Sequence, residues 1–206
     1  MKLRTLFFAV LTLFAVSSIG FSKEASKTIG NIKAAIKGET TASAKYAAYA
    51  LKAKEEGFAK IAVLFEAASK AELIHANNHR AVLEQLGEKM EEFKPEYSVK
   101  STKENLEDAY KGESYEIATM YPGFIKQAQK ENVNLALISF NYAYQTEKKH
   151  QALYKNAAEQ MKANKETMLP SKYMVCQTCG NTYDGEAPAR CGISMTPKER
   201  FITIGA

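Results

Sequence analysis

Two short motifs of the sequence pair a carboxylate with an imidazole three residues later. They are Glu72-Leu-Ile-His75 and Glu147-Lys-Lys-His150, and each residue of the second lies 75 positions after its counterpart in the first. A spacing of three places both side chains of a pair on one helix face. Both pairs lie on apolar stripes, where a charge is costly unless it is paired or bound to a metal ion. The four residues are therefore candidate metal ligands.

Acidic residues also interrupt the apolar stripes of two other predicted helices. Glu39 lies on one of them, and Glu113 and Glu116 lie on the other. Two helices that each supply a central glutamate, with two that each supply Glu-x-x-His, form the ligand pattern of dinuclear carboxylate sites in helical bundles. Divalent ions would neutralise carboxylates that otherwise repel one another. Oxygen and imidazole ligands favour iron or manganese.

Hydrophobic periodicity predicts four long helices that position these residues. They cover about 26–56, 58–86, 101 onward and 132–162. Gly57 and Gly87 are expected to end the first two, and a capping box at Ser101 is expected to open the third. Pro122 predicts a kink or local opening one to two turns beyond the acidic residues. The fold class is mainly α, a four-helix bundle over 26–164.

The two helical hairpins form an internal repeat with an offset of 74–75 residues. Gly38-Glu39-Thr40 matches Gly112-Glu113-Ser114, and Phe65 matches Phe140. His79 has no repeated carboxylate partner, so it is interpreted as a core histidine satisfied by hydrogen bonds. A single glutamate on a stripe is usually a boundary residue, but four helices that share the ligand pattern favour metal binding.

The tail, 173–206, follows a linker at 165–172 and contains all three cysteines. Cys176-Gln-Thr-Cys179 forms one knuckle, and Cys191 precedes Ser194 at the spacing of a second. Two such knuckles about a dozen residues apart indicate a four-thiolate metal site. Here Ser194 occupies the fourth position. A redox-active or vestigial cysteine pair is the alternative.

The N-terminal residues, 1–20, have the pattern of an export signal. Lys2 and Arg4 precede an apolar run over 6–16, and small residues up to Gly20 suit cleavage. The run is shorter than the roughly 20 residues of a membrane span, so we expect export to the periplasm rather than a stable membrane anchor. The formal net charge of +5 is too mild to indicate nucleic-acid binding.

With these motifs, the chain from about residue 26 to 206 resembles the rubrerythrin family. Gly112-Glu113-Ser114-Tyr115-Glu116 and Tyr121-Pro122 add to the likeness. That family joins a ferritin-like di-iron four-helix bundle to a small C-terminal rubredoxin-like domain. The resemblance therefore implies two non-haem iron ions in the bundle and one mononuclear iron in the tail, where zinc or a vacant site are the alternatives.

The resemblance also implies a role for each candidate residue. One iron would take Glu39 and, depending on redox state, His75 or Glu116. The other would take Glu113 and His150, and the two ions would be bridged by Glu72 and Glu147. Tyr46 and Tyr121 match catalytic tyrosines beside the site. The tail ligands would be Cys176, Cys179 and Cys191, with Ser194 at the fourth position, where the pattern calls for a thiolate.

The implied activity is a peroxidase that defends against oxidative stress. Hydrogen peroxide would be reduced to water with electrons relayed through the rubredoxin-like domain, from a rubredoxin or an NAD(P)H-dependent reductase. A homodimer is expected. The alternatives are a ferroxidase or iron-binding protein without dedicated electron input, and a metal-stabilised assembly module without enzymatic activity.

Overall fold

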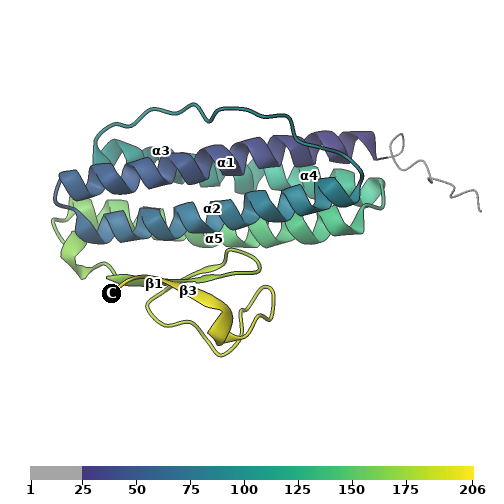
Figure 1. Cartoon of the computed structure of the whole chain (residues 1–206). Helices are drawn as coiled ribbons and strands as arrows, with labels where there is room; N and C mark the ends of the chain where they lie inside the picture. Colours follow the sequence, from purple (N-terminus) through teal and green to yellow (C-terminus); the bar gives the residue numbers. More distant parts are fainter. Residues whose placement is uncertain (1–24) are drawn as a thin grey trace, which may run out of the picture.

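The chain folds into a long helical bundle with a small sheet along one side (Figure 1). The computed structural model describes residues 25–206, and the predicted export signal lies outside them. The helices are α1 (Ser26–Glu55), α2 (Ala59–Gln85), α3 (Thr102–Tyr115), α4 (Tyr121–Lys130) and α5 (Asn134–Lys162). The predicted class, a mainly α bundle followed by a small tail domain, is confirmed.

The ends of the helices follow local signals in the sequence. Gly57 takes φ 86° after α1, and the Phe58 amide donates to the Ala53 carbonyl at 2.8 Å. That left-handed conformation is readily available to glycine, and it satisfies carbonyls at the end of the helix. Ser101 and Glu104 form a capping box at the start of α3. Both predictions are confirmed.

The third predicted helix is divided by a π-helical segment, Glu116–Met120. The opening was expected beyond the acidic residues, but it begins at Glu116 itself, so its predicted position was wrong. Pro122 lacks an amide proton, and in a regular helix its ring would clash with the carbonyl four residues earlier, at Ala118. The disturbance therefore lies before the proline, and a π-turn accommodates it.

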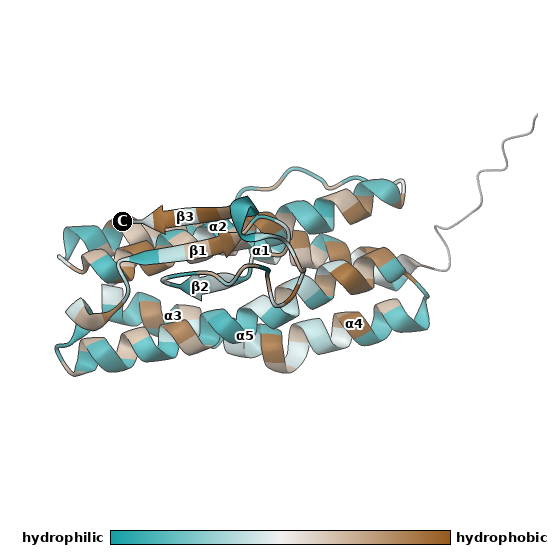
Figure 2. Cartoon of the chain, turned by 90° about the horizontal axis from the view of Figure 1, so that it is seen from below, coloured by the Kyte–Doolittle hydropathy of each residue, from teal (hydrophilic) through white to brown (hydrophobic). Residues whose placement is uncertain are grey.

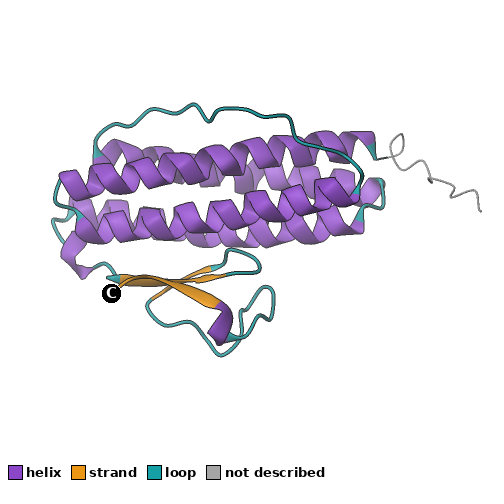
Figure 3. Ribbon diagram, in the orientation of Figure 1, coloured by secondary structure: helices purple, strands orange, loops and turns teal. Residues whose placement is uncertain are grey.

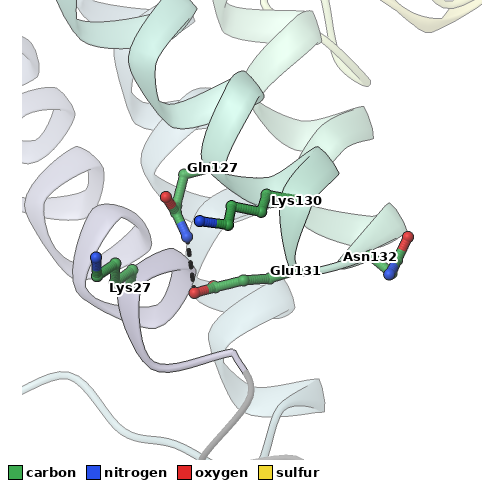
Figure 4. A pocket seen from close by; sticks show the side chains of 5 residues that line it. All are labelled: Lys27, Gln127, Lys130, Glu131 and Asn132. Carbon is green, nitrogen blue, oxygen red and sulfur yellow. Dashed lines mark hydrogen bonds between the residues drawn. The ribbon is translucent and has the colours of Figure 1, made fainter.

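The two helical hairpins cap each other's first helix. The Glu56 carboxylate accepts the Thr102 amide at 2.8 Å, and the Glu131 carboxylate accepts the Thr28 amide at 2.8 Å. The Gln127 side-chain amide donates a hydrogen bond to Glu131 Oε1 at 2.8 Å, and both residues line the surface pocket drawn in Figure 4. A carboxylate at a helix N-terminus satisfies free amides and opposes the helix dipole. The internal repeat is thus also a repeat of interhelical contacts.

Two apolar clusters occupy the two ends of the bundle. One gathers around Tyr49, Phe65 and Leu106, and the other around Ile32, Ile36 and Phe140. The buried charged residues belong to neither cluster. A connection without regular secondary structure, which runs along the outside of the bundle, joins α2 to α3 (Figure 1). None of the helices among the described residues is long and apolar enough to cross a membrane.

The tail forms a three-stranded antiparallel sheet with the order β2-β1-β3 (Figure 3). Its strands are β1 (Lys172–Cys176), β2 (Thr182–Asp184) and β3 (Phe201–Gly205), with short helical turns at Glu166–Met168 and Lys198–Arg200. Val175 in β1 lies opposite Thr182 and Ile202. The sheet lies against the bundle at α2 and α5 (Figure 2), which brings the cysteine knuckle over the middle of the bundle.

Candidate metal centre

Carboxylates and imidazoles from four helices meet inside the bundle. Two groups of ligand atoms each lie within 4.8 Å of one another, and they share Glu72 and Glu147. One group adds Glu39 from α1 and His75 from α2, and the other adds Glu113 from α3 and His150 from α5. All six residues are buried. The structure thus brings together the predicted ligands of both irons, with the predicted bridging pair common to the two groups.

Each histidine presents Nδ1 to both bridging carboxylates. His75 Nδ1 lies 2.8 Å from Glu72 Oε2 and 2.9 Å from Glu147 Oε1. His150 Nδ1 lies 2.8 Å from Glu147 Oε2 and 3.1 Å from Glu72 Oε1. One ring proton cannot point at two carboxylates at once, whereas a cation beside Nδ1 attracts both. The arrangement suits a metal ion near each ring.

Buried polar atoms without a partner support the same interpretation. Among the described residues, Glu39 Oε2, Glu72 Oε1, His150 Nδ1 and both carboxylate oxygens of Glu147 make no hydrogen bond of good geometry, although the histidine Nδ1 atoms lie 2.8–3.1 Å from the Glu72 and Glu147 oxygens. Buried polar atoms are nearly always satisfied, because an unpaired one costs about 1–3 kcal/mol. These atoms face the centre of the cluster, and carboxylate oxygen with one imidazole per ion fits two iron or manganese ions.

The electrostatics of the cluster show the cost of carboxylates without a metal. Burial, together with the charges of Glu72 and Glu147, holds the pKa of Glu39 and Glu113 well above its usual value. Burial acts on Glu72 in the same direction, but the neighbouring imidazoles outweigh it and bring its pKa to about 2. For His150, burial is overcome by the two carboxylates, which raise its pKa to about 10. Bound cations would take the place of these ring protons.

The outer nitrogen of His75 contacts the tail. His75 Nε2 lies 3.0 Å from the carbonyl oxygen of Cys179. A carbonyl oxygen only accepts, so His75 carries its proton on Nε2 and leaves Nδ1 free for a metal. Gly180 allows this approach: a Cβ there would lie 2.4 Å from His75 Nε2, and its φ of +78° also disfavours other residues.

The same arrangement recurs at His150. Its Nε2 lies 3.0 Å from Thr182 Oγ1, and Thr182 donates its hydroxyl proton to the Gly180 carbonyl at 3.0 Å. His150 is therefore also protonated on Nε2, with Nδ1 toward the cluster. Sequence reasoning missed both contacts, because nothing in the local sequence of the tail marks Thr182 or a backbone carbonyl as a partner of a bundle histidine.

The two predicted catalytic tyrosines occupy equivalent places in the two hairpins. Tyr46 donates to Glu113 Oε1 at 2.8 Å, and Tyr121 donates to Glu39 Oε1. Each hydroxyl thus contacts the terminal carboxylate supplied by the other hairpin. Burial and the surrounding carboxylates raise the pKa of both phenols, so both are protonated and can act as hydrogen donors.

Glu116 lies beside the cluster and outside both ligand groups. It is half-buried, in contrast to Glu113 one turn earlier. Burial and the charge of Glu39 raise its pKa well above the usual value. The resemblance to the family implied that His75 and Glu116 alternate at one iron, and in this structure His75 belongs to the ligand group and Glu116 does not. Glu116 opens the π-helical segment, and such segments are frequent at functional sites.

Four side chains of the tail form the second candidate site. The sulfurs of Cys176, Cys179 and Cys191 lie within 4.8 Å of one another, and all three are free thiols. Ser194 Oγ lies 3.3 Å from Cys176 Sγ. A hydrogen bond from Cys179 outweighs burial and lowers the pKa of Cys176 to about 4. Three sulfurs and one hydroxyl thus enclose a position suited to a single metal ion.

His79 has hydrogen-bond partners on both ring nitrogens, as the sequence predicted for a core histidine. Ser139 Oγ lies 2.7 Å from Nδ1, and Tyr121 Oη lies 3.2 Å from Nε2. Burial, with the neighbouring His75, lowers the pKa of His79 to about 3, so the ring is neutral. Its direct contact with Tyr121 has no signal in the sequence.

A buried dinuclear carboxylate cluster in a four-helix bundle defines a ferritin-like protein. The family model described as Rubrerythrin matches residues 30–158. Nigerythrin of Nitratidesulfovibrio vulgaris is 38% identical over 177 residues, 84% of this chain and 85% of that protein. Rubrerythrin-2 of Clostridium acetobutylicum is 31% identical over 171 residues, 82% of this chain and 92% of that protein.

Solved structures agree with the sequence comparisons. Nigerythrin in its fully reduced, all-ferrous state is similar with a TM-score of 0.78 and 34% identity, over 98% of this chain and 100% of that one. A bacterioferritin of Rhodobacter capsulatus has a TM-score of 0.62 at 20% identity over 67% of this chain and 87% of that one, which shows the shared fold. The chain belongs to the rubrerythrin family, a family of di-iron oxidoreductases with a rubredoxin-like iron site.

Proposed function

We propose that this protein is a non-haem di-iron peroxidase that reduces hydrogen peroxide to water. The reaction consumes one peroxide, two electrons and two protons and yields two water molecules. The observation that carries the proposal is the hydrogen bond between Cys179 and His75. Through this bond a residue of the three-thiol site contacts a candidate ligand of the buried cluster. The two sites are therefore connected by a single hydrogen bond, through which electrons could pass.

The residues of the chain divide the work of this reaction. Glu39, Glu72, Glu113, Glu147 and the two histidines would hold two iron ions, which supply the two electrons when bound. Tyr46 and Tyr121 have hydroxyl groups next to the terminal carboxylates, where they can donate protons. The buried surroundings exclude bulk water and strengthen the electrostatic contacts.

Electrons would enter through the tail. Cys179 belongs to the candidate mononuclear site and also accepts the hydrogen bonds of His75 and Thr146 through its carbonyl. The side-chain amide of Asn78 on α2 donates a hydrogen bond to the carbonyl of the adjacent residue, Thr178, at 2.8 Å. The tail is thus fixed against the cluster at several points, which favours a relay over iron handling without electron input. A rubredoxin or an NAD(P)H-dependent reductase is the proposed donor.

Glu116→Ala tests the peroxidase proposal. We expect the variant to keep two irons in the bundle, because Glu116 lies outside both ligand groups. Peroxide turnover should fall roughly tenfold or more, which corresponds to a loss of about 1.4 kcal/mol of transition-state stabilisation. Glu107→Ala, an exposed glutamate on α3, is the control. Equal turnover in Glu116→Ala and the parent would reject this role and favour iron oxidation or storage.

We also propose that the protein is exported to the periplasm and works there as a homodimer. The pattern of residues 1–20 supports export. Fractionation of cells that produce the full chain, with N-terminal sequencing of the product, tests the cleavage near Gly20. Light scattering of the purified protein tests the dimer.

A further inference from the structure

A buried chain of hydrogen bonds runs from α5 to the candidate metal centre. Ser139 Oγ lies 2.7 Å from His79 Nδ1, and His79 Nε2 lies 3.2 Å from the Tyr121 oxygen. Tyr121 in turn donates to Glu39 Oε1. The four residues come from α5, α2, α4 and α1, and all are buried. The chain therefore links all four sides of the bundle.

The direction of each hydrogen bond follows from the number of available protons. Glu39 as a metal ligand is ionised and only accepts, so the single hydroxyl proton of Tyr121 points at it. The Tyr121 oxygen must then accept from His79, which requires a proton on Nε2. A neutral imidazole carries one ring proton, so Nδ1 accepts from Ser139. Every proton in the chain points toward Glu39.

The other hairpin lacks this chain. Tyr46 contacts Glu113 as Tyr121 contacts Glu39, but the residue 75 positions after His79 is Tyr154, and Ser139 has Leu64 as its counterpart. The Tyr154 ring lies against Tyr46, with centroids 5.6 Å apart, and its buried hydroxyl meets no hydrogen-bond partner in good geometry among the described residues. A hydrogen-bonded histidine with a serine behind it is therefore found beside the catalytic tyrosine in one half of the pseudo-symmetric site, where the other half has Tyr154 and Leu64.

We propose that His79 is a positioning residue, which holds the Tyr121 hydroxyl proton toward Glu39, and that Ser139 selects the required imidazole tautomer. Tyr121, and not Tyr46, is then the hydroxyl that gives a proton to peroxide. This inference rests on the proposed peroxide reduction. Tyr121 supplies one of the two protons consumed and solvent supplies the other, while the two electrons would come from the iron ions that the cluster would hold. Solvent then returns a proton to the Tyr121 phenolate.

The role of His79 has two consequences. A fixed donor behind Tyr121 removes the alternative rotations of its hydroxyl, so the proton is already directed when the substrate arrives. After Tyr121 has given up its proton, the Nε2 proton of His79 also stabilises the resulting phenolate oxygen by a hydrogen bond. Neither function requires His79 to bind metal, so iron content should not depend on it.

Substitutions at His79 test the effect on turnover. His79→Leu removes the donor, and we expect kcat for peroxide to fall about tenfold, as for the loss of one preorganised hydrogen bond, with KM and iron content unchanged. His79→Gln keeps an N–H group and should recover most of the rate. Tyr154→Phe, at the equivalent place in the other half, should stay within about twofold of the parent, because Tyr46 is not the proton donor in this proposal. A parent-like kcat in His79→Leu would overturn the proposal.

The tautomer of His79 gives a readout that needs no turnover. In ¹⁵N-histidine-labelled protein loaded with zinc, which is diamagnetic, the two-bond proton–nitrogen spectrum should show His79 protonated on Nε2. Ser139→Ala should introduce the other tautomer. A proton on Nδ1 in the parent would overturn the proposal. If the parent failed to reduce peroxide but kept the Nε2 proton, the peroxidase proposal alone would fail.

Discussion

Ser194 is the residue at which the tail departs from its own pattern of thiolates. It faces Cys176 at 3.3 Å, and its hydroxyl also contacts Thr196 Oγ1 at 2.8 Å. A hydroxyl is a far weaker acid than a thiol, so it is a poorer ligand for a soft site. Three thiolates and one oxygen donor would favour ferric over ferrous iron, because the ferric ion is the harder cation.

Ser194→Cys should therefore strengthen iron binding in the tail. We expect a rubredoxin-like visible spectrum, a higher reduction potential and faster donor-dependent peroxide reduction, if delivery through the tail limits turnover. Ser194→Ala, which removes the oxygen and adds no sulfur, is the control and should lose the metal more readily. The measurements are iron content, spectrum and rate. A parent that already holds a tightly bound iron with a four-sulfur spectrum would contradict the assignment of Ser194.

Glu147 supplies a carboxylate to both ligand groups and to both histidines. Its removal affects both proposed ions, whereas loss of a terminal ligand such as Glu39 affects one. We expect Glu147→Ala to lower the bundle metal content from two ions to one or none, measured by elemental analysis. Glu159→Ala, an exposed glutamate on the same helix, should keep both. Two ions with unchanged spectra in Glu147→Ala would argue against the bridging role.

At the scale of elements, the loop between β1 and β2 decides how the two candidate sites communicate. It presents the Cys179 carbonyl to His75 and approaches the bundle so closely that only a hydrogen fits on Gly180. The bundle helices contribute Asn78 and Thr146 to the same loop. The position of one glycine thus controls the distance between the tail and the cluster.

Gly180→Ala should separate the tail from the cluster. The added Cβ would lie 2.4 Å from His75 Nε2, and a left-handed conformation costs a non-glycine residue about 1–2 kcal/mol. Gly185→Ala is a matched control, because Gly185 has φ +75° but no atom within 4 Å of its Cβ position. Both variants should lose stability from the left-handed conformation, and Gly180→Ala should lose more because of the clash with His75. Only Gly180→Ala should also slow electron delivery to the bundle irons, measured by stopped-flow reduction. Equal rates in the two variants would show that this contact does not carry the electrons.

At the scale of the whole molecule, the candidate metal ions belong to the core. Four glutamates and two histidines lie buried between the apolar clusters at the two ends of the bundle. Buried charges without counterions are costly, so the cluster without metal lowers the stability of the folded bundle. The bundle gains stability from any ion that binds only the folded state.

Removal of the metals should lower the melting temperature. A ligand at about 1,000 times its Kd contributes ~4 kcal/mol, and each kcal/mol corresponds to about 2–4 °C for a chain of this size. We therefore expect a fall of roughly 10 °C after treatment with a chelator and reductant, measured by calorimetry, with recovery when ferrous ion is added. Glu147→Ala, which is expected to hold one ion or none, should show a smaller fall under the same treatment. An unchanged melting temperature in the parent would mean that the cluster is stable without metal.

The candidate ligands, the helices and the repeat could be predicted from the sequence itself. Glu72 and His75 share a helix face because they are three residues apart, and Ser101 caps its helix through a neighbour three residues on. Such relations are local, so spacing and residue type suffice to predict them. The cluster then follows, because four amphipathic helices can bury their apolar faces only by packing together.

The contacts between the two sites, and the hydrogen bonds that cross the bundle, were decided by the tertiary structure alone. His75 and the Cys179 carbonyl are 104 residues apart, and His79 and Ser139 are 60 apart. The π-helical segment also begins earlier than the proline indicated. No periodic pattern encodes such contacts, because they depend on how the tail docks and how the helices rotate against one another. That docking is the sum of many packing interactions, each too small to leave a signal in the local sequence.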